Sequence, residues 1–150
     1  MVKFLIAGHG YLADGIKSTI SIIMGDEIAD QIMTLNGFVE DGSMDVTGDI
    51  EKIINSIDEN DKIIIFSDLM HGSINQFLIP YIDENRIYII SGINFPLVCE
   101  IISKYIFGNL KEVNVDDLKS DIEKARQEII YVNDYIKENS FDKNDDEFFG

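Results

Sequence analysis

Four short apolar runs recur along this chain, and a segment with helical spacing follows each of them. A dense apolar run without polar alternation is typical of a strand that is buried on both faces of its sheet. Strands that alternate with helices need crossover connections, which are right-handed and place helices on both sides of a parallel sheet. The sequence therefore predicts an α/β fold with three αβα layers and a mainly parallel four-stranded sheet. The strands are expected at 2–7, 31–35, 62–67 and 86–91.

Apolar residues three or four positions apart predict the helices between these strands. In the first helix, Leu12, Ile16 and Ile20 share a face, and Gly25 is a credible stop. In the third helix, Pro80 is expected to kink or shorten the helix because proline has no N–H to donate. The helices are expected at 11–24, 45–57, 74–83, 96–107 and 116–127.

The end of the chain is less regular. Ile129–Val132 follows the last helix and could extend it or form a strand, and its β-branched and aromatic residues favour a strand. From Asn139 the chain reads NSFDKNDDEFFG, which is acidic and has no period. We therefore expect one domain at 1–135 and an acidic, flexible tail at 136–150.

The charge balance excludes several kinds of partner. Lys and Arg together number 12 and Asp and Glu 28, so the formal net charge is −16. Nucleic acids and anionic membrane surfaces attract a basic face, so neither is expected as a partner. A basic protein would be steered toward this acidic surface.

The cysteine content and the N-terminus favour a cytoplasmic location. Cys99 is the single cysteine and cannot form an internal disulfide, which suits a reducing compartment. The N-terminus lacks the basic stretch, long apolar core and small-residue cleavage site of a signal peptide. No apolar run approaches the ~20 residues that span a bilayer, so direct membrane insertion is not expected.

Three loops are expected to gather at one edge of the sheet. Ligands of open α/β sheets bind beyond the carboxyl ends of the strands. The loops that follow the first, third and fourth strands are Gly8–Gly10, Asp68–Ser73 and Gly92–Pro96. Besides the residues discussed next, we expect the site to include loop residues Gly10, His71, Gly72 and Asn94.

His9 is the first candidate for chemistry, since it directly follows the first strand and stands between two glycines. Glycine on each side removes steric bulk, so that a partner can approach the imidazole closely. A helix N-terminus follows, where backbone N–H groups favour an anion. These features predict a histidine that accepts a phosphoryl group. The alternative is a polar strand-end residue that caps its surroundings.

Asp68 and Ser73 are the candidates to assist His9. A carboxylate that accepts a hydrogen bond from one imidazole nitrogen fixes the tautomer and leaves the other nitrogen free to attack. The Ser73 hydroxyl, beside the flexible backbone of Gly72, could donate to a phosphate oxygen. Both residues could instead cap the turn or the following helix, and for Ser73 the two roles are compatible.

The second histidine, His71, lies three residues after Asp68. It could be a further ligand or an alternative acceptor, and the favoured interpretation is a surface residue near the site. Two histidines and an aspartate also allow a metal site. Because they lack the local i, i+4 spacing of helical ligands, no metal is predicted.

Three motifs together resemble the IIA component of the mannose family of the bacterial sugar phosphotransferase system, over roughly residues 1 to 135. The family's G-[TS]-H-G turn is seen here as Ala7-Gly8-His9-Gly10. Its D-[LT]-x-G-G-[ST]-P loop is seen as the stretch from Asp68 to Ile74, and its G-[VIM]-N-[ILF]-P loop as the stretch from Gly92 to Pro96. Each motif alone is weak, but their order on the expected elements is specific.

The resemblance implies a phosphoryl carrier without metal or nucleotide. His9 would be phosphorylated by the phosphocarrier protein HPr and would pass the phosphoryl group to a IIB partner during sugar uptake. Asp68 would be the aspartate partner of His9, and Ser73 the hydroxyl residue. The family fold also implies a homodimer that exchanges a fifth, antiparallel strand, onto which Ile129–Val132 maps.

Two departures from the family pattern concern the second loop. His71 stands where the family usually has glycine, and Ile74 where it usually has proline. A side chain at position 71 could crowd the pocket or add a donor to the phosphate, and so alter transfer rate or partner choice.

Two other functions are compatible with parts of the sequence. A two-component receiver would use Asp68 as acceptor, but it needs paired acids after the first strand to hold Mg²⁺, where this chain has Gly8-His9-Gly10. The other alternative is a phosphorylation-dependent regulatory module of the same fold that has no role in sugar transport.

Overall fold

The sheet has four parallel strands in the order β2-β1-β3-β4 in this computed structural model, which describes residues 1–42 and 44–139. The strands are β1 (Val2–His9), β2 (Ile32–Gly37), β3 (Lys62–Ser67) and β4 (Ile87–Ser91). Each predicted strand is confirmed to within two residues at either end. Because β2 and β3 lie on opposite sides of β1, the strand order reverses at the carboxyl end of β1, which is where α/β sheets bind their ligands.

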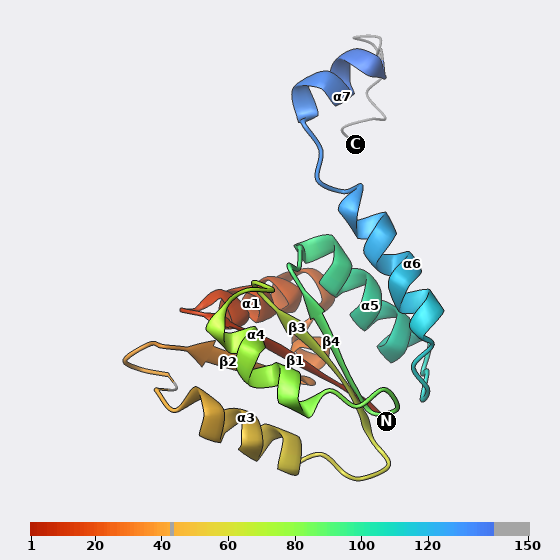
Figure 1. Cartoon of the computed structure of the whole chain (residues 1–150). Helices are drawn as coiled ribbons and strands as arrows, with labels where there is room; N and C mark the ends of the chain where they lie inside the picture. The colour runs from red at the N-terminus through yellow and green to blue at the C-terminus, as the bar shows by residue number, and fades with distance from the viewer. Residues whose placement is uncertain (43, 140–150) are drawn as a thin grey trace.

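Helices cover both faces of the sheet and confirm the three αβα layers (Figure 1). One face carries α1 (Leu12–Met24), α5 (Phe95–Phe107) and α6 (Val115–Arg126), and the other carries α3 (Val46–Asn55) and α4 (Ser73–Leu78). A short helix, α2 (Asp26–Ala29), follows α1 and was not expected from the sequence.

The strands are buried on both faces because their side chains serve two cores. In β1, Phe4 and Ile6 contact the core under α1 and α5, whereas Leu5 and Ala7 contact the core under α3 and α4. Alternate side chains of a strand point to opposite faces, so an unbroken apolar run supplies both cores at once.

Polar caps fix where several helices begin. The side chains of Asp45, Asn94 and Asn114 accept hydrogen bonds from the backbone N–H groups three residues on, at the starts of α3, α5 and α6. The helix expected to reach residue 83 ends at Leu78 and continues as a 3₁₀ turn, Ile79–Tyr81. Pro80 therefore shortens this helix, because its ring removes a backbone donor.

An ion pair joins α5 and α6, which cover the same face of the sheet. Lys104 of α5 donates to both carboxylate oxygens of Asp121 of α6, each at 2.8 Å, and Asp121 is 2% exposed. The hydrogen bonds that Lys104 donates to Asp121 raise the pKa of Lys104, against the smaller opposing effect of burial. The buried carboxylate thus has its charge compensated in place.

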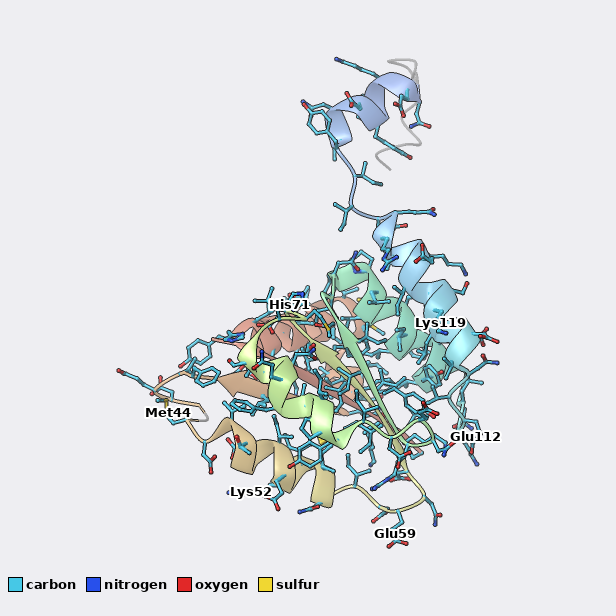
Figure 2. All side chains as sticks on the ribbon, in the orientation of Figure 1. Met44, Lys52, Glu59, His71, Glu112 and Lys119 are labelled. Carbon is cyan, nitrogen blue, oxygen red and sulfur yellow. The ribbon has the colours of Figure 1, made fainter. Side chains whose placement is uncertain are left out.

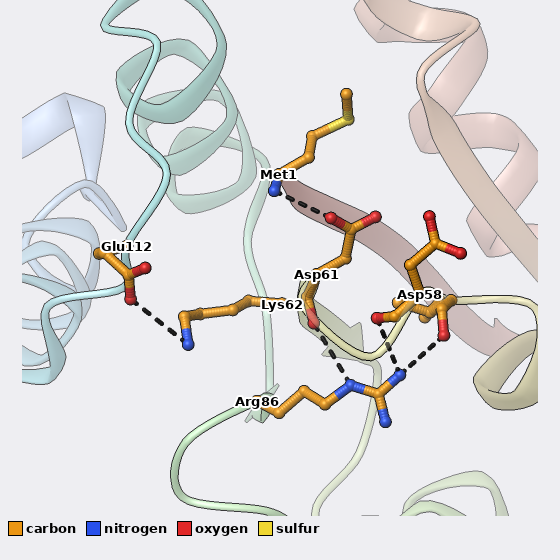
Figure 3. A network of polar contacts seen from close by, with 7 residues as sticks. Met1, Asp58, Asp61, Lys62, Arg86 and Glu112 are labelled. Carbon is orange, nitrogen blue, oxygen red and sulfur yellow. Dashed lines mark hydrogen bonds and ion pairs between the residues drawn. The ribbon is translucent and has the colours of Figure 1, made fainter.

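A polar network ties the strands together at the amino end of the sheet (Figure 3). The N-terminal ammonium group donates to Asp61 at 2.9 Å, and Arg86 donates to the backbone carbonyl oxygens of Asp58 and Asp61. Lys62 donates to the carbonyl oxygen of Asn85 at 2.7 Å. These contacts lie at the opposite end of the strands from His9, so they stabilise the sheet without entering the candidate site.

The C-terminal strand expected at 129–132 is not formed in the single chain. Ile129–Tyr131 has no regular structure, and Val132 begins α7 (Val132–Glu138), which stands away from the sheet beyond α6 (Figure 1). Strand propensity acts only where a neighbouring edge is paired, and this segment pairs with neither edge strand of its own chain, β2 or β4.

The predicted boundary at 135/136 falls within α7, and residues 140–150 of the expected tail lie outside the described residues. In the part of the chain that the structure describes, no helix is long and apolar enough to cross a membrane.

Candidate functional site

The register of the parallel strands brings His9 and Asp68 together. Ala7 of β1 pairs with Ser67 of β3, so the residues that follow each of them meet at the carboxyl edge of the sheet. A Cβ atom at Gly8 would lie 3.4 Å from Oδ2 of Asp68, at ordinary van der Waals contact, so this carboxylate lies next to the backbone that precedes His9. The strand register, rather than a missing side chain, therefore sets this approach.

A single carboxylate oxygen holds both the backbone and the ring of His9. Oδ2 of Asp68 accepts from the backbone N–H of His9 at 2.9 Å and lies 2.7 Å from Nδ1 of its ring. Oδ1 accepts from the backbone N–H of Leu69 at 2.8 Å. An ionised carboxylate can only accept, so Nδ1 carries a proton and the lone pair of the neutral imidazole is on Nε2.

The electrostatics of Asp68 favour its ionised form. Burial alone raises the pKa of this carboxyl group. The hydrogen bonds from the backbone and ring of His9 and from Leu69 outweigh burial, so the pKa of Asp68 lies below its ordinary value of 3.8. Asp68 is therefore a carboxylate at neutral pH, as an acceptor for Nδ1–H must be.

Ser73 lies on the other side of the imidazole. Its Oγ is 3.3 Å from Nε2 of His9. A hydroxyl at this distance can donate to the unprotonated nitrogen, or turn toward an oxygen of a group bound there. The alternative role of Ser73 as a helix cap is not found: Gly72 occupies the N-cap of α4 without a side-chain bond, and Ser73 is the first helical residue.

The site is open to solvent on one side. The His9 side chain is 39% exposed, whereas that of Asp68 is 10% exposed. Gly72 keeps one edge of the ring clear, because a Cβ atom there would lie 3.0 Å from Cε1 of His9. The imidazole is therefore partly open to solvent, whereas the carboxylate bound to Nδ1 is protected.

A buried asparagine that the sequence analysis missed holds the loop after β3. Asn75 of α4 accepts from the hydroxyl of Ser67 at 3.0 Å and donates to the carbonyl oxygen of Met70 at 3.1 Å. Both Ser67 and Asn75 are buried. The sequence signal was a polar residue between the apolar Ile74 and Leu78 on a helix face that covers the sheet.

A phenylalanine that the sequence analysis also missed covers one face of the His9 imidazole. The ring centroids of Phe38 and His9 are 5.6 Å apart and their planes are inclined by 25°, a stacked arrangement. Phe38 directly follows β2, whose last residue, Gly37, pairs with His9. Its place next to the histidine could have been predicted only from the strand order.

The remaining predicted residues have varied positions. Gly10 turns with φ of 59° and donates to the carbonyl oxygen of Gly37 at 2.9 Å, which joins the ends of β1 and β2. Asn94 caps α5 and donates to the carbonyl oxygen of Ala125, and neither bond reaches His9. His71 is exposed at the carboxyl end of the sheet, far from Glu59 and Glu112 (Figure 2).

The two departures from the family pattern lie in different environments. Ile74 is fully buried in the core under α3 and α4, where a side chain at Gly37 would clash with it. His71 is exposed. Among residues 1–42 and 44–139, no three His, Cys, Asp or Glu side chains lie together as candidate metal ligands.

These features define a doubly wound α/β protein that presents a carboxylate-bound histidine where the strand order reverses. The chain matches the family model of the PTS (phosphotransferase system) fructose IIA component over residues 3–118, and it belongs to this family. It is thus a component of a sugar phosphotransferase system, as the motifs predicted.

Solved structures agree with this assignment. A protein from Klebsiella pneumoniae described as a phosphoenolpyruvate-dependent sugar phosphotransferase system permease is 26% identical, with a TM-score of 0.75 over 90% of this chain and 93% of that one. The IIA protein of a fucose utilization operon from Streptococcus pneumoniae is 22% identical, with a TM-score of 0.72 over 90% and 96%. Component EIIA from Streptococcus agalactiae is 23% identical, with a TM-score of 0.67 over 89% and 98%. The similarity to the last two structures shows the fold alone.

Proposed function

We propose that this protein carries a phosphoryl group on Nε2 of His9, which it accepts from phosphorylated HPr and passes to a IIB partner during sugar uptake. The observation that supports this function best is the bond between Asp68 and Nδ1. It leaves the lone pair on Nε2 of a ring that is 39% exposed. A histidine held in this way is prepared for attack by one defined nitrogen.

The transfer needs little covalent chemistry from the protein. The Nε2 lone pair attacks the phosphorus of the donor's phosphohistidine in line, a new N–P bond forms and the donor's N–P bond breaks. The released electron pair returns to the donor's imidazole. Asp68 compensates the positive charge that develops on His9, and the Ser73 hydroxyl donates to a phosphoryl oxygen. Transfer to IIB is the same step in reverse.

The surface around His9 suits a protein partner. Four large apolar side chains next to the site are exposed: Leu69 and Met70 in the loop after β3, and Tyr11 and Leu12 at the start of α1. Exposed apolar side chains that gather around a reactive group are typical of protein interfaces. The net charge of −16 would attract a donor with a basic face, and this attraction weakens with salt.

The direct test is phosphorylation in a reconstituted system. Incubation with phosphoenolpyruvate, enzyme I and HPr should raise the intact mass by about 80 Da, the mass of one phosphoryl group. His71→Ala should gain the same mass, because His71 lies in solvent and outside the Asp68 bond. Subsequent addition of IIB should remove the label from a carrier, whereas a purely regulatory module would keep it. A label on His71 would contradict the site.

We also propose that the chain forms a homodimer through its C-terminal segment. An open groove of about 520 Å³ runs along β4, between this edge strand and α6, and its lining includes the apolar Ile82, Ile87, Leu118 and Ile122. Residues 129–132 are apolar and exposed, and they pair with no strand of their own chain. An antiparallel strand at 129–132 from a second copy would pair with β4 and cover the groove.

The dimer can be tested with one charge substitution. Wild type should have twice the chain mass of 17.0 kDa in light scattering or sedimentation. Ile130→Asp should be monomeric, because a carboxylate would be buried in the groove. Ile22→Asp is the matched control, since Ile22 is an exposed isoleucine on α1. A wild-type monomer, or an Ile130→Asp dimer, would contradict the exchange.

A further inference from the structure

Phe38 has a backbone conformation that its residue type disfavours. Its φ is 63°, in the left-handed region. Among the described residues other than glycine, only Asn109 shares a positive φ, and asparagine tolerates it far better than a bulky aromatic residue does. Strained backbone of this kind persists where the surroundings hold it, and it is concentrated at functional sites.

Burial does not account for this conformation. Phe38 is 47% exposed, so its ring is not held in the hydrophobic core. The ring instead stacks on the imidazole of His9, with centroids 5.6 Å apart. The left-handed turn directly after Gly37 is what directs the side chain toward the end of β1, since Gly37 and His9 are partners in the sheet.

The stacking contact completes the restraints on the imidazole. Asp68 holds the Nδ1 edge, Ser73 lies at the Nε2 edge, and both act within the plane of the ring. A single hydrogen bond to Nδ1 still allows the ring to tilt out of that plane. Phe38 occupies one face and opposes this tilt.

We propose that Phe38 is a positioning residue for phosphoryl transfer, and this inference rests on the proposed function of His9. By covering one face of the imidazole, it keeps Nε2 directed toward the partner. Its aromatic face also attracts the positive charge that spreads over the ring when Nε2 is phosphorylated. The ring of Phe38 thus favours both the geometry of attack and the charge of the product.

The test compares variants with and without an aromatic ring at position 38. Phe38→Leu keeps an apolar side chain but loses the ring, and its rate constant for phosphoryl acceptance from phospho-HPr should fall by about 3- to 30-fold. Phe38→Tyr should stay within about twofold of wild type, because it restores the aromatic face. Met44→Ala, an exposed apolar residue farther along the same loop, should leave the rate unchanged and controls for lost apolar surface.

Two further measurements separate positioning from folding. Phe38→Gly relieves the backbone strain, so it should melt at or above the temperature of Phe38→Leu and yet transfer as slowly. In NMR spectra of the unphosphorylated protein, the carbon-bound ring protons of His9 should show an upfield ring-current shift in wild type and Phe38→Tyr. This shift should be lost in Phe38→Leu.

The outcomes distinguish this inference from the proposed function. A phosphorylated wild type together with a Phe38→Leu variant of equal rate would overturn the role of Phe38 alone, as would the absence of the ring-current shift. A wild type that accepts no phosphoryl group would overturn the proposed function, and the transfer role of Phe38 with it.

Discussion

Replacing His9 with glutamine is expected to abolish phosphoryl acceptance, with a loss on the order of 10⁴-fold or more. Glutamine can still form a hydrogen bond, but its amide has no nucleophilic nitrogen lone pair. The nearest hydroxyl, that of Ser73, has no base to activate it once the imidazole is gone. After incubation with phosphoenolpyruvate, enzyme I and HPr, the intact mass of the variant should be unchanged.

His71→Gln is the matched control for this experiment, because it removes the other histidine by the same substitution. It should be labelled at the wild-type rate. His9→Gln should also melt close to wild type, since the replaced side chain is 39% exposed and lies outside both cores. If His9→Gln is phosphorylated while His71→Gln is not, the acceptor is His71 and the assignment of the site is wrong.

The architecture could be predicted because local sequence and tertiary structure agree in most of the chain. The apolar run at 62–67 has no polar alternation, and β3 is buried on both faces. Pro80 was expected to shorten the helix after Ser73, and it does. At 129–132 no strand forms within the single chain, because strand propensity does not determine whether an edge is within reach, and the exchanged strand stays a proposal.

The central pair of the site could be predicted because parallel strands end at the same edge. His9 and Asp68 each follow a strand, and the register of those strands brings them within 2.7 Å. The place of Ser73 beside this pair could be predicted as well, because the turn after β3 leads the chain back over the sheet. The motif spacing thus contains the information on which side chains meet, although not on their hydrogen-bond geometry.

Phe38 and Asn75 could not be predicted by the same reasoning. A left-handed φ is anticipated at glycine or asparagine, so nothing in the residue type of Phe38 indicates its turn. Asn75 bonds Ser67 and Met70 through contacts that exist only once α4 lies on the sheet. Both residues support the site from neighbouring elements, and such support depends on tertiary structure rather than on local pattern.

The position of Phe38 also explains part of the turn that follows β1. Gly10 has a φ of 59°, and its N–H donates to the carbonyl oxygen of Gly37. Gly37 directly precedes Phe38. Gly10 therefore joins the end of β2, and with it Phe38, to the turn that follows His9.

Asp68→Asn is expected to slow phosphoryl acceptance by about 10²- to 10⁴-fold. The carboxylate accepts from three N–H groups, two of His9 and one of Leu69. Asparagine has one oxygen and one NH₂ group, so it cannot accept from both sides. Where its NH₂ group faces the imidazole, Nδ1 must be the acceptor and Nε2 carries the proton, which removes the lone pair needed for attack.

Asp58→Asn is the control for the lost negative charge, because Asp58 is exposed at the opposite end of the sheet and contacts Arg86 only through its backbone carbonyl in the network of Figure 3. It should transfer at the wild-type rate at moderate salt. Equal slowing of both variants would mean that Asp68 acts through net charge, and an unslowed Asp68→Asn would remove it from the mechanism.

The pH dependence of folding gives an independent measure of the same carboxylate. Because the pKa of Asp68 in the folded protein is below 3.8, its ionised form contributes stability at higher pH, and this contribution is lost as the pH falls through the folded value. The free energy of unfolding of wild type should therefore exceed that of Asp68→Asn at neutral pH. This difference in the free energy of unfolding, measured by urea titration at a series of pH values, should become smaller below about pH 4. A difference in unfolding free energy that does not change with pH would mean that the bonds to His9 and Leu69 do not depend on the charge of Asp68. In that case the carboxylate does not hold the proton on Nδ1.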